Sequence, residues 1–237
     1  MTIACWSGPR NISTALMRSW SSRSDTYVSD EPLYAHYLKE TAFNHPMNDE
    51  IIKAYPTNYN FIIKSLTSIN PEAKKIWYQK HMAHHLLSIN NLTWIKDFHN
   101  CILIRHPKHV INSYVKKNTL TSVSDLGYPQ QLSIIRFLKK EKLKFYIIDS
   151  DDFLKNPKKK MNDWCNFLQI DFQKSMLSWP KGPNINDGVW GKHWYDNINN
   201  STKFFEHKSS LSESYKEFGF IYDDAKDLYK KIYKISV

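Results

Sequence analysis

A turn near the amino terminus carries residues that suit an anion. An apolar run, Ile3–Trp6, is followed by a Gly-Pro turn, after which Leu16, Met17 and Trp20 repeat at helical spacing. The first turn of a helix has unpaired N–H groups and the positive end of the dipole, so we expect a phosphate or sulfate there. An ordinary capped corner is the alternative. The residues expected at the anion are Pro9, Arg10, Asn11, Ile12, Ser13 and Thr14.

A second anion site is expected at Arg105. The stretch Asn100–Pro107 predicts a buried strand that delivers this arginine to the same sheet edge, and Lys108–Tyr114 predicts a helix with a proline in its first turn. Arg105 offers a forked, charge-assisted donor, and Ser113 offers a hydroxyl. The arrangement repeats that of the first site.

Two residues are candidates for a general base. Glu31 follows the expected strand Thr26–Ser29, at the end where open α/β sheets bind ligands, although an acidic turn is the alternative. Lys80 and His81 end another expected strand, Lys75–His81. His81 needs only a small shift of its pKa to titrate near neutrality, whereas Glu31 needs its pKa raised by burial. We therefore favour His81 slightly.

Three histidines raise the question of a metal. His81, His84 and His85 would share one face if residues Met82–Ile89 were helical, as their spacing predicts. No matching cysteine, glutamate or second histidine cluster completes a ligand set, so we expect no metal. Structural imidazoles are the simpler interpretation of His84 and His85.

Length and composition limit the class of protein. The 237 residues suffice for one large domain, expected over residues 1–237, and the net charge of +10 suits anionic partners without identifying them. The lysine-rich run Lys155–Lys160 indicates a solvated helix start rather than a nucleic-acid contact. No run reaches the roughly 18 apolar residues of a membrane span. Nucleic acid and membrane are therefore not expected as partners.

Three cysteines, Cys5, Cys101 and Cys165, fall inside expected apolar elements. An odd number in such places fits buried, reduced thiols better than a disulfide framework. We expect a cytoplasmic protein.

The remaining elements alternate between strand and helix, which predicts a parallel sheet with right-handed crossovers. Packing helices are expected within Asn48–Ile69, and helices at Gln130–Lys142 and Lys158–Leu168 flank a strand at Lys144–Asp149. Periodicity fades over residues 179–207, where an aromatic, lysine-bearing loop suggests a lid or ligand clamp. Residues 212–233 predict a closing amphipathic helix.

These motifs together resemble the sulfotransferases that use 3′-phosphoadenosine 5′-phosphosulfate (PAPS). Residues Ser7–Thr14 are similar to the family's 5′-phosphosulfate loop, with Asn11-Ile12 where many members have Ser-Gly. Leu103–Pro107 with Ser113 is similar to its 3′-phosphate motif, and Gly188–Lys192 through Thr202 to its carboxyl-terminal donor loop. The likeness extends from residue 2 to about residue 207.

The resemblance implies an α/β fold with a central, mostly parallel sheet flanked by helices, like that of P-loop NTPases. It implies PAPS as co-substrate without a metal, a small-molecule hydroxyl or amine as acceptor, and donor contacts from Trp190 and Lys192. Arg10 would stabilise charge on the leaving nucleotide, and Lys80 would neutralise charge or lie at the acceptor. Some members use a histidine as base, which Lys80-His81 approximates, and others a glutamate, as Glu31 offers. A homodimer stays open.

Two other functions compete with sulfuryl transfer. A kinase or NTPase is suggested by Ile147–Asp152, which imitates a magnesium-binding strand end, but the first loop lacks Gly-x4-Gly-Lys-Ser/Thr. A catalytically silent nucleotide-binding protein is the second alternative. Polar groups at three strand ends favour a working site over it.

Overall fold

The apolar runs of the sequence form one sheet of five parallel strands, in the order β2-β3-β1-β4-β5. The computed structural model describes residues 1–41, 43, 45–87, 91–205 and 213–236. The central strands are buried on both faces, as a parallel sheet between helices requires. The strands are β1 (Thr2–Ser7), β2 (Thr26–Asp30), β3 (Ile76–Met82), β4 (His99–Ile104) and β5 (Phe145–Asp149).

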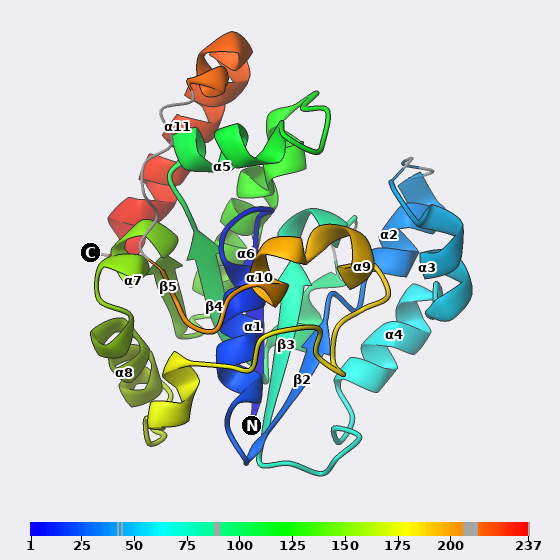
Figure 1. Cartoon of the computed structure of the whole chain (residues 1–237), viewed down its shortest axis with the longest axis vertical. Helices are drawn as coiled ribbons and strands as arrows, with labels where there is room; N and C mark the ends of the chain where they lie inside the picture. Colours follow the sequence, from blue (N-terminus) through cyan, green and yellow to red (C-terminus); the bar gives the residue numbers. More distant parts are fainter. Residues whose placement is uncertain (42, 44, 88–90, 206–212, 237) are drawn as a thin grey trace.

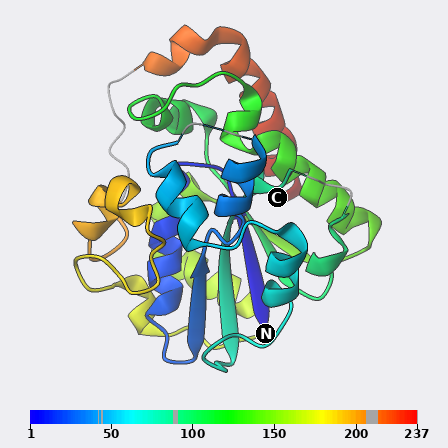
Figure 2. The same cartoon turned by 90° about the vertical axis from the view of Figure 1, so that its right-hand side faces the viewer.

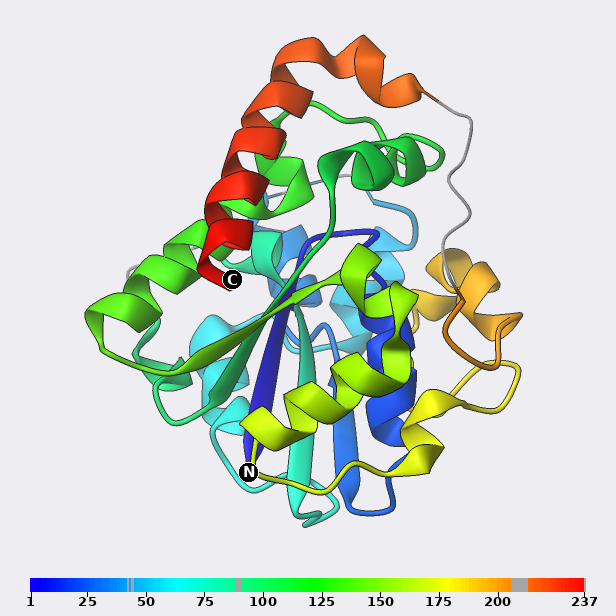
Figure 3. The same cartoon turned by 90° about the vertical axis from the view of Figure 1, so that its left-hand side faces the viewer.

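Helices cover both faces of the sheet. In Figure 2 the sheet lies between α1, drawn in blue, and α11, drawn in red. One face packs against α1 and α8, through side chains such as Trp20 and Trp164; Figure 3 views α8 from this side. The other face packs against α4, α5, α6 and α11. The helices are α1 (Ser13–Ser21), α2 (Tyr34–Thr41), α3 (Asn48–Ala54), α4 (Tyr59–Leu66), α5 (Pro107–Tyr114), α6 (Tyr128–Lys140), α7 (Ser150–Lys155), α8 (Pro157–Phe167), α9 (Gly191–Trp194), α10 (Asp196–Asn199) and α11 (Gly219–Ser236).

The expected α/β architecture with a parallel sheet is confirmed. Each of the five expected strands is present, and the three cysteines are buried free thiols. The strand ends that carry polar residues, at β1, β2, β3 and β4, lie at the same edge because all pairs are parallel (Figure 1). In the part of the chain that the structure describes, no helix is long and apolar enough to cross a membrane.

Three expected boundaries are wrong. The chain after β3 forms only a 3-10 turn, Ala83–His85, instead of a helix reaching Ile89; residues 88–90 lie outside the described part. Helix α6 already begins at Tyr128, because a proline fits a first helical turn, whose N–H groups have no partner. Helix α11 begins at Gly219, after a 3-10 segment Ser214–Phe218, so the closing helix starts later than residue 212, itself outside the described part.

Candidate functional site

A cavity of about 370 Å³ opens at the carboxyl ends of β1, β2 and β3. It lies where open α/β sheets bind ligands. At one end is the turn that joins β1 to α1, and at the other are groups that follow β2 and β3. The structure brings nine of the expected site residues to its walls: Pro9, Arg10, Asn11, Ile12, Ser13, Thr14, Glu31, Lys80 and Ser113.

The turn has an unusual backbone. Arg10 and Ile12 both adopt left-handed conformations, with φ of 61° and 58°. A β-branched residue such as Ile12 strongly disfavours this region, and such strain costs about 1–3 kcal/mol. Strained backbone of this kind persists where surrounding contacts hold it, and it concentrates at functional sites.

Two side chains behind the turn hold its carbonyl groups. Arg105 Nη1 donates to the Arg10 carbonyl at 3.0 Å, and the one hydroxyl proton of Ser150 is shared between the Asn11 carbonyl at 3.0 Å and the Ile104 carbonyl at 2.8 Å. In a trans peptide the N–H points opposite to the C=O. The N–H groups of Asn11 and Ile12 therefore point away from Arg105 and Ser150, which makes this turn a concave set of donors suited to an anion.

Arg10 and Ser113 meet in the cavity, where Arg10 Nε donates to Ser113 Oγ at 2.9 Å. The sequence places them at separate sites, and the fold joins these sites. Burial, and then repulsion from the Arg105 guanidinium, lowers the pKa of Arg10. A bound anion would offset that repulsion, so the electrostatics of this end favour a negatively charged ligand.

Arg105 follows β4 at the expected sheet edge but is not among the residues that line this cavity. It is only 4% exposed, and its Nε donates to Asp151 Oδ1 at 3.1 Å. Asp151 also accepts from His109 Nδ1 at 2.9 Å. Arg105 therefore supports the turn from behind with Nη1, whereas its buried Nη2 has no hydrogen-bond partner among the described residues.

A buried charge cluster forms the other end of the cavity. Lys80 Nζ lies 2.7 Å from Glu31 Oε1 and 2.8 Å from Asp30 Oδ1. Burial lowers the pKa of Lys80, but the two carboxylates outweigh it and raise that pKa well above its usual value. Lys80 therefore stays a cation, and the cluster combines one positive charge with two carboxyl groups.

Glu31 is the carboxyl group of this cluster that faces the cavity. Burial raises its pKa, which the nearby Lys80 only partly reverses. Its φ is also left-handed, at 39°, and its N–H donates to the Lys80 carbonyl at 2.9 Å. A carboxylate with a raised pKa at the end of a ligand cavity has the properties of a general base.

His81 is placed on the opposite face of β3 from Lys80, which corrects its expected placement at the acceptor. Side chains alternate along a strand, so neighbours cannot both face the cavity. The His81 ring stacks on Trp6 at 4.4 Å, and its Nε2 lies 3.0 Å from Gln79 Oε1. Burial lowers its pKa to about 3, which leaves it a neutral core imidazole.

Trp190 and Lys192 do not line this cavity, and their expected donor contacts stay a prediction. Trp190 is buried and donates its Nε1–H to the Tyr195 hydroxyl at 3.1 Å, whereas Lys192 is exposed on the surface. The segment from residue 179 nevertheless reaches the cavity with other residues; residues 206 and 207 of the expected lid are outside the described part. These lining residues are Trp179, Trp194, Tyr195, Asn197, Ile198, Ser201, Lys203, Phe204 and Phe205.

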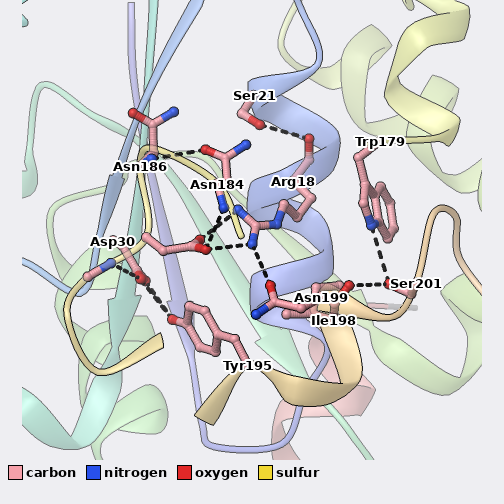
Figure 4. Close-up of polar contacts among 12 residues, drawn as sticks. Arg18, Ser21, Asp30, Trp179, Asn184, Asn186, Tyr195, Ile198, Asn199 and Ser201 are labelled. Carbon is pink, nitrogen blue, oxygen red and sulfur yellow. Dashed lines mark hydrogen bonds and ion pairs between the residues drawn. The ribbon is translucent and has the colours of Figure 1, made fainter. Parts of the chain in front are cut away.

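A buried ion pair fixes this segment on α1. Arg18 donates to both carboxylate oxygens of Asp187, each at 2.6 Å, and to Asn199 Oδ1 at 3.1 Å. Figure 4 shows these contacts, with Tyr195 of the same segment pointing to Asp30. The aromatic segment is thereby bound to the body of the protein at both α1 and β2.

Several lining residues were missed from the sequence, above all His45, His84 and His85. Burial lowers the pKa of His45 and of His84 to about 4, so both rings are neutral at pH 7. The His85 ring is stacked between Tyr34 and Tyr37, with both centroid distances at 4.7 Å. The signal that could have found His84 and His85 is their position directly after a strand end.

The sequence predicts no metal site, and the arrangement of possible ligand side chains bears on this prediction. Within residues 1–41, 43, 45–87, 91–205 and 213–236, no group of three or more His, Cys, Asp or Glu side chains is placed to hold a metal ion.

A model of the family described as "Sulfotransferase domain" matches residues 1–230. The chain belongs to this sulfotransferase family. The resemblance seen in the anion-binding motifs is thereby confirmed at the level of the family.

Three solved structures have the same fold. The sulfotransferase domain of the curacin biosynthetic pathway is 16% identical, with a TM-score of 0.51 over 95% of this chain and 90% of that one. The sulfotransferase domain of the Synechococcus PCC 7002 olefin synthase is 17% identical, with a TM-score of 0.54 over 95% and 94%. A sulfotransferase from Alicyclobacillus acidocaldarius is 11% identical, with a TM-score of 0.54 over 97% and 94%.

Two curated relatives come from Arabidopsis thaliana and are named branched-chain-amino-acid aminotransferase-like proteins 1 and 2. They are 36% and 34% identical to this chain over 202 residues. The match covers 85% of this chain but 36% of each relative. The chain thus spans about a third of the length of the curated relatives it matches.

Proposed function

We propose that this protein transfers the sulfuryl group of PAPS to a hydroxyl or amine of a small molecule. One observation carries the proposal: a single cavity joins the anion-binding turn, with Arg10 and Ser113, to the buried pair Glu31–Lys80. The first end suits the charged groups of the nucleotide, and the second suits removal of a proton from an acceptor. Membership in the sulfotransferase domain family supports the same reaction class.

The donor occupies the end of the cavity formed by the turn. Backbone N–H groups of residues 11–14 and the hydroxyls of Ser13 and Thr14 hold its anionic groups. Arg10 and Ser113, which touch each other, bind the same molecule. As the bridging S–O bond breaks, negative charge develops on the departing nucleotide, and the fixed positive charge of Arg10 stabilises it. Arginine keeps its proton, so this role is electrostatic.

Glu31 is the general base in this proposal. Its carboxylate accepts the proton of the acceptor hydroxyl or amine while the acceptor atom forms a bond to sulfur, and it later releases that proton to water. Lys80, held as a cation beside it, offsets the negative charge that builds on the transferred group. The products are the sulfated acceptor and 3′-phosphoadenosine 5′-phosphate (PAP).

The acceptor lies between Glu31 and walls made of uncharged rings. Tyr34, His45, His84 and Trp194 surround this end, and the two histidines are neutral at pH 7 because burial lowers their pKa values to about 4. Such walls suit a small acceptor without a negative charge. Binding then needs little desolvation of the protein.

Nucleotide binding tests the donor end. We expect PAP to raise the melting temperature without Mg²⁺, and Arg10→Ala to weaken PAP binding about tenfold to a hundredfold, the value of a charged hydrogen bond. Arg136→Ala, an exposed arginine on α6, is the matched control and should bind PAP as the wild type does. Stabilisation by MgATP alone would instead favour a kinase or NTPase, and no response to any nucleotide would overturn the proposal.

Transfer from radiolabelled PAPS to a panel of small alcohols, phenols and amines tests the reaction. With any acceptor found, Glu31→Gln should lower kcat about a hundredfold to ten-thousandfold while PAP affinity stays within about twofold. A protein that binds PAP yet labels no acceptor would be a silent nucleotide-binding protein. A fully active Glu31→Gln variant would remove Glu31 from the mechanism.

A further inference from the structure

Tyr195 lies at the centre of the buried charge cluster although it is far away in sequence. Its hydroxyl oxygen accepts from Lys80 Nζ at 2.6 Å and from Trp190 Nε1 at 3.1 Å. The same hydroxyl donates to the Asp30 carboxylate, at 2.8 Å from Oδ2 (Figure 4). Tyr195 is 5% exposed, so these three groups replace water as its hydrogen-bond partners.

We propose that Tyr195 is a positioning residue whose hydroxyl holds Asp30 and Lys80 in place and thereby sets the charge that Glu31 faces. This inference rests on the proposed role of Glu31 as general base. It gives the aromatic segment a function at the acceptor end.

The groups that face Glu31 come from four parts of the fold. Asp30 precedes it on β2, Lys80 comes from β3, Tyr34 from α2 and Tyr195 from the end of α9. Burial, and then the Asp30 charge, raises the pKa of Tyr195 well above its usual value, so it remains a neutral donor. Lys80 is thus the one cation of this set, and it is shared between two carboxyl groups.

The Tyr195 hydroxyl affects how the positive charge of Lys80 is divided between Asp30 and Glu31. Lys80 Nζ donates to Tyr195 at 2.6 Å, to Glu31 at 2.7 Å and to Asp30 at 2.8 Å, and the Tyr195 donor supplies to Asp30 part of the positive charge that this carboxylate would otherwise draw from Lys80. Without it, Asp30 would draw Lys80 closer, and Glu31 would lose part of its counter-charge. The pKa of Glu31 would then rise; the direct side-chain contact between Tyr195 and Glu31, which lowers the pKa of Glu31, would be lost as well and acts in the same direction.

Contacts that do not involve Lys80 fix the position of Tyr195. The Gly188 N–H donates to Asp30 Oδ2 at 3.0 Å, and Asp187 forms the double contact with Arg18. A Cβ on Gly188 would lie 2.1 Å from the Trp190 ring, so the chain is closely packed there. Tyr195 is therefore delivered to the cluster by a segment that the Arg18–Asp187 pair anchors outside the cluster, as positioning requires.

The test is a carboxyl titration that needs no acceptor. In protein labelled with δ-13C glutamate, the Glu31 signal is identified by its loss in Glu31→Gln, and its pKa is measured by NMR. We expect Tyr195→Phe to raise this pKa by roughly half a unit to one unit, the equivalent of one hydrogen bond. Tyr55→Phe is the matched control, because Tyr55 accepts from the Val189 N–H of the same segment and should leave the Glu31 pKa unchanged.

A second variant covers the case in which Tyr195→Phe does not fold. With 3-fluorotyrosine at position 195, the hydroxyl is a stronger donor to Asp30, so the Glu31 pKa should fall instead of rise. An unchanged Glu31 titration in either variant would overturn the inference. The proposed function is judged separately, by PAP binding and sulfuryl transfer, so either proposal can fail while the other stands.

Discussion

The two ends of the cavity are built in different ways. The donor end is a continuous turn, residues 9–14, completed by Ser113. The acceptor end is assembled from Glu31, Lys80 and Tyr195, where Lys80 lies 49 positions from Glu31 and 115 from Tyr195. The donor end therefore combines local backbone geometry with support from Arg105 and Ser150, whereas the acceptor end depends on long-range packing alone. Mutations at the two ends of the cavity should therefore differ in their effects on stability and on ligand binding.

The largest effect on stability is expected at the Arg18–Asp187 ion pair, which holds the aromatic segment that carries Tyr195 to the acceptor end. Asp187→Asn leaves the buried Arg18 guanidinium without its carboxylate, and we expect the free energy of unfolding to fall by about 3–5 kcal/mol in urea denaturation. Asp163→Asn, which breaks the exposed pair with Lys159, is the control and should cost less than about 1 kcal/mol. Equal losses of unfolding free energy in the two variants would show that the Arg18–Asp187 pair stabilises the fold no more than an exposed ion pair does.

At the donor end, two variants distinguish support of the turn from direct contact with the ligand. Arg105→Ala should weaken PAP binding about tenfold to a hundredfold, and Ser150→Ala about threefold to tenfold, because each removes a donor to a turn carbonyl. Calorimetric titration with PAP measures both. If Ser150→Ala binds normally while Arg105→Ala does not, Arg105 acts on the ligand itself.

The acceptor end should also make stability depend on pH. Burial lowers the pKa of His84 to about 4 in the folded protein, against about 6.5 when unfolded. Between these values the unfolded chain binds a proton that the folded chain does not, so stability falls as pH falls from about 6.5 to 4, by up to about 1.4 kcal/mol per pH unit for one imidazole.

Urea denaturation at pH 7, 6 and 5 measures the slope of unfolding free energy against pH. His84→Asn should reduce this slope by up to the value for one bound proton, about 1.4 kcal/mol per pH unit. A slope that is the same in His84→Asn as in the wild type would contradict the burial of a neutral His84 at this end. His45, whose pKa is also lowered to about 4 by burial, contributes in the same direction.

The smallest effect is expected at the strained turn. Ile12→Gly removes the cost of a β-branched residue at φ 58°, about 1–3 kcal/mol, but also removes a half-buried side chain of similar value. We expect a net change of unfolding free energy below about 1 kcal/mol. Ile63→Gly, at a half-buried isoleucine of α4 with ordinary backbone, is the control and should cost about 2 kcal/mol. Equal losses would show that the turn is unstrained.

The sequence by itself identified the parallel α/β fold, the family and the turn that joins the first strand to the first helix. These features are local: an apolar run, a turn and a helix start lie within about twenty residues of each other, and β1, β4 and their helices follow from periodicity. The base was open between His81 and Glu31, because the sequence does not say which face of β3 meets the cavity. A shift of the strand by one residue would turn His81 toward the cavity and Lys80 away from it.

Tertiary structure alone decided which charged groups meet. Arg105 lies behind the turn because Asp151 accepts from it there, and Trp190 is buried against Tyr34 and Tyr55 and donates to Tyr195. The Asp30–Lys80–Tyr195 contacts likewise join residues far apart in the chain. Local spacing determines which backbone groups are left unpaired at a helix start, whereas the partner of a buried charge depends on the packing of the whole molecule.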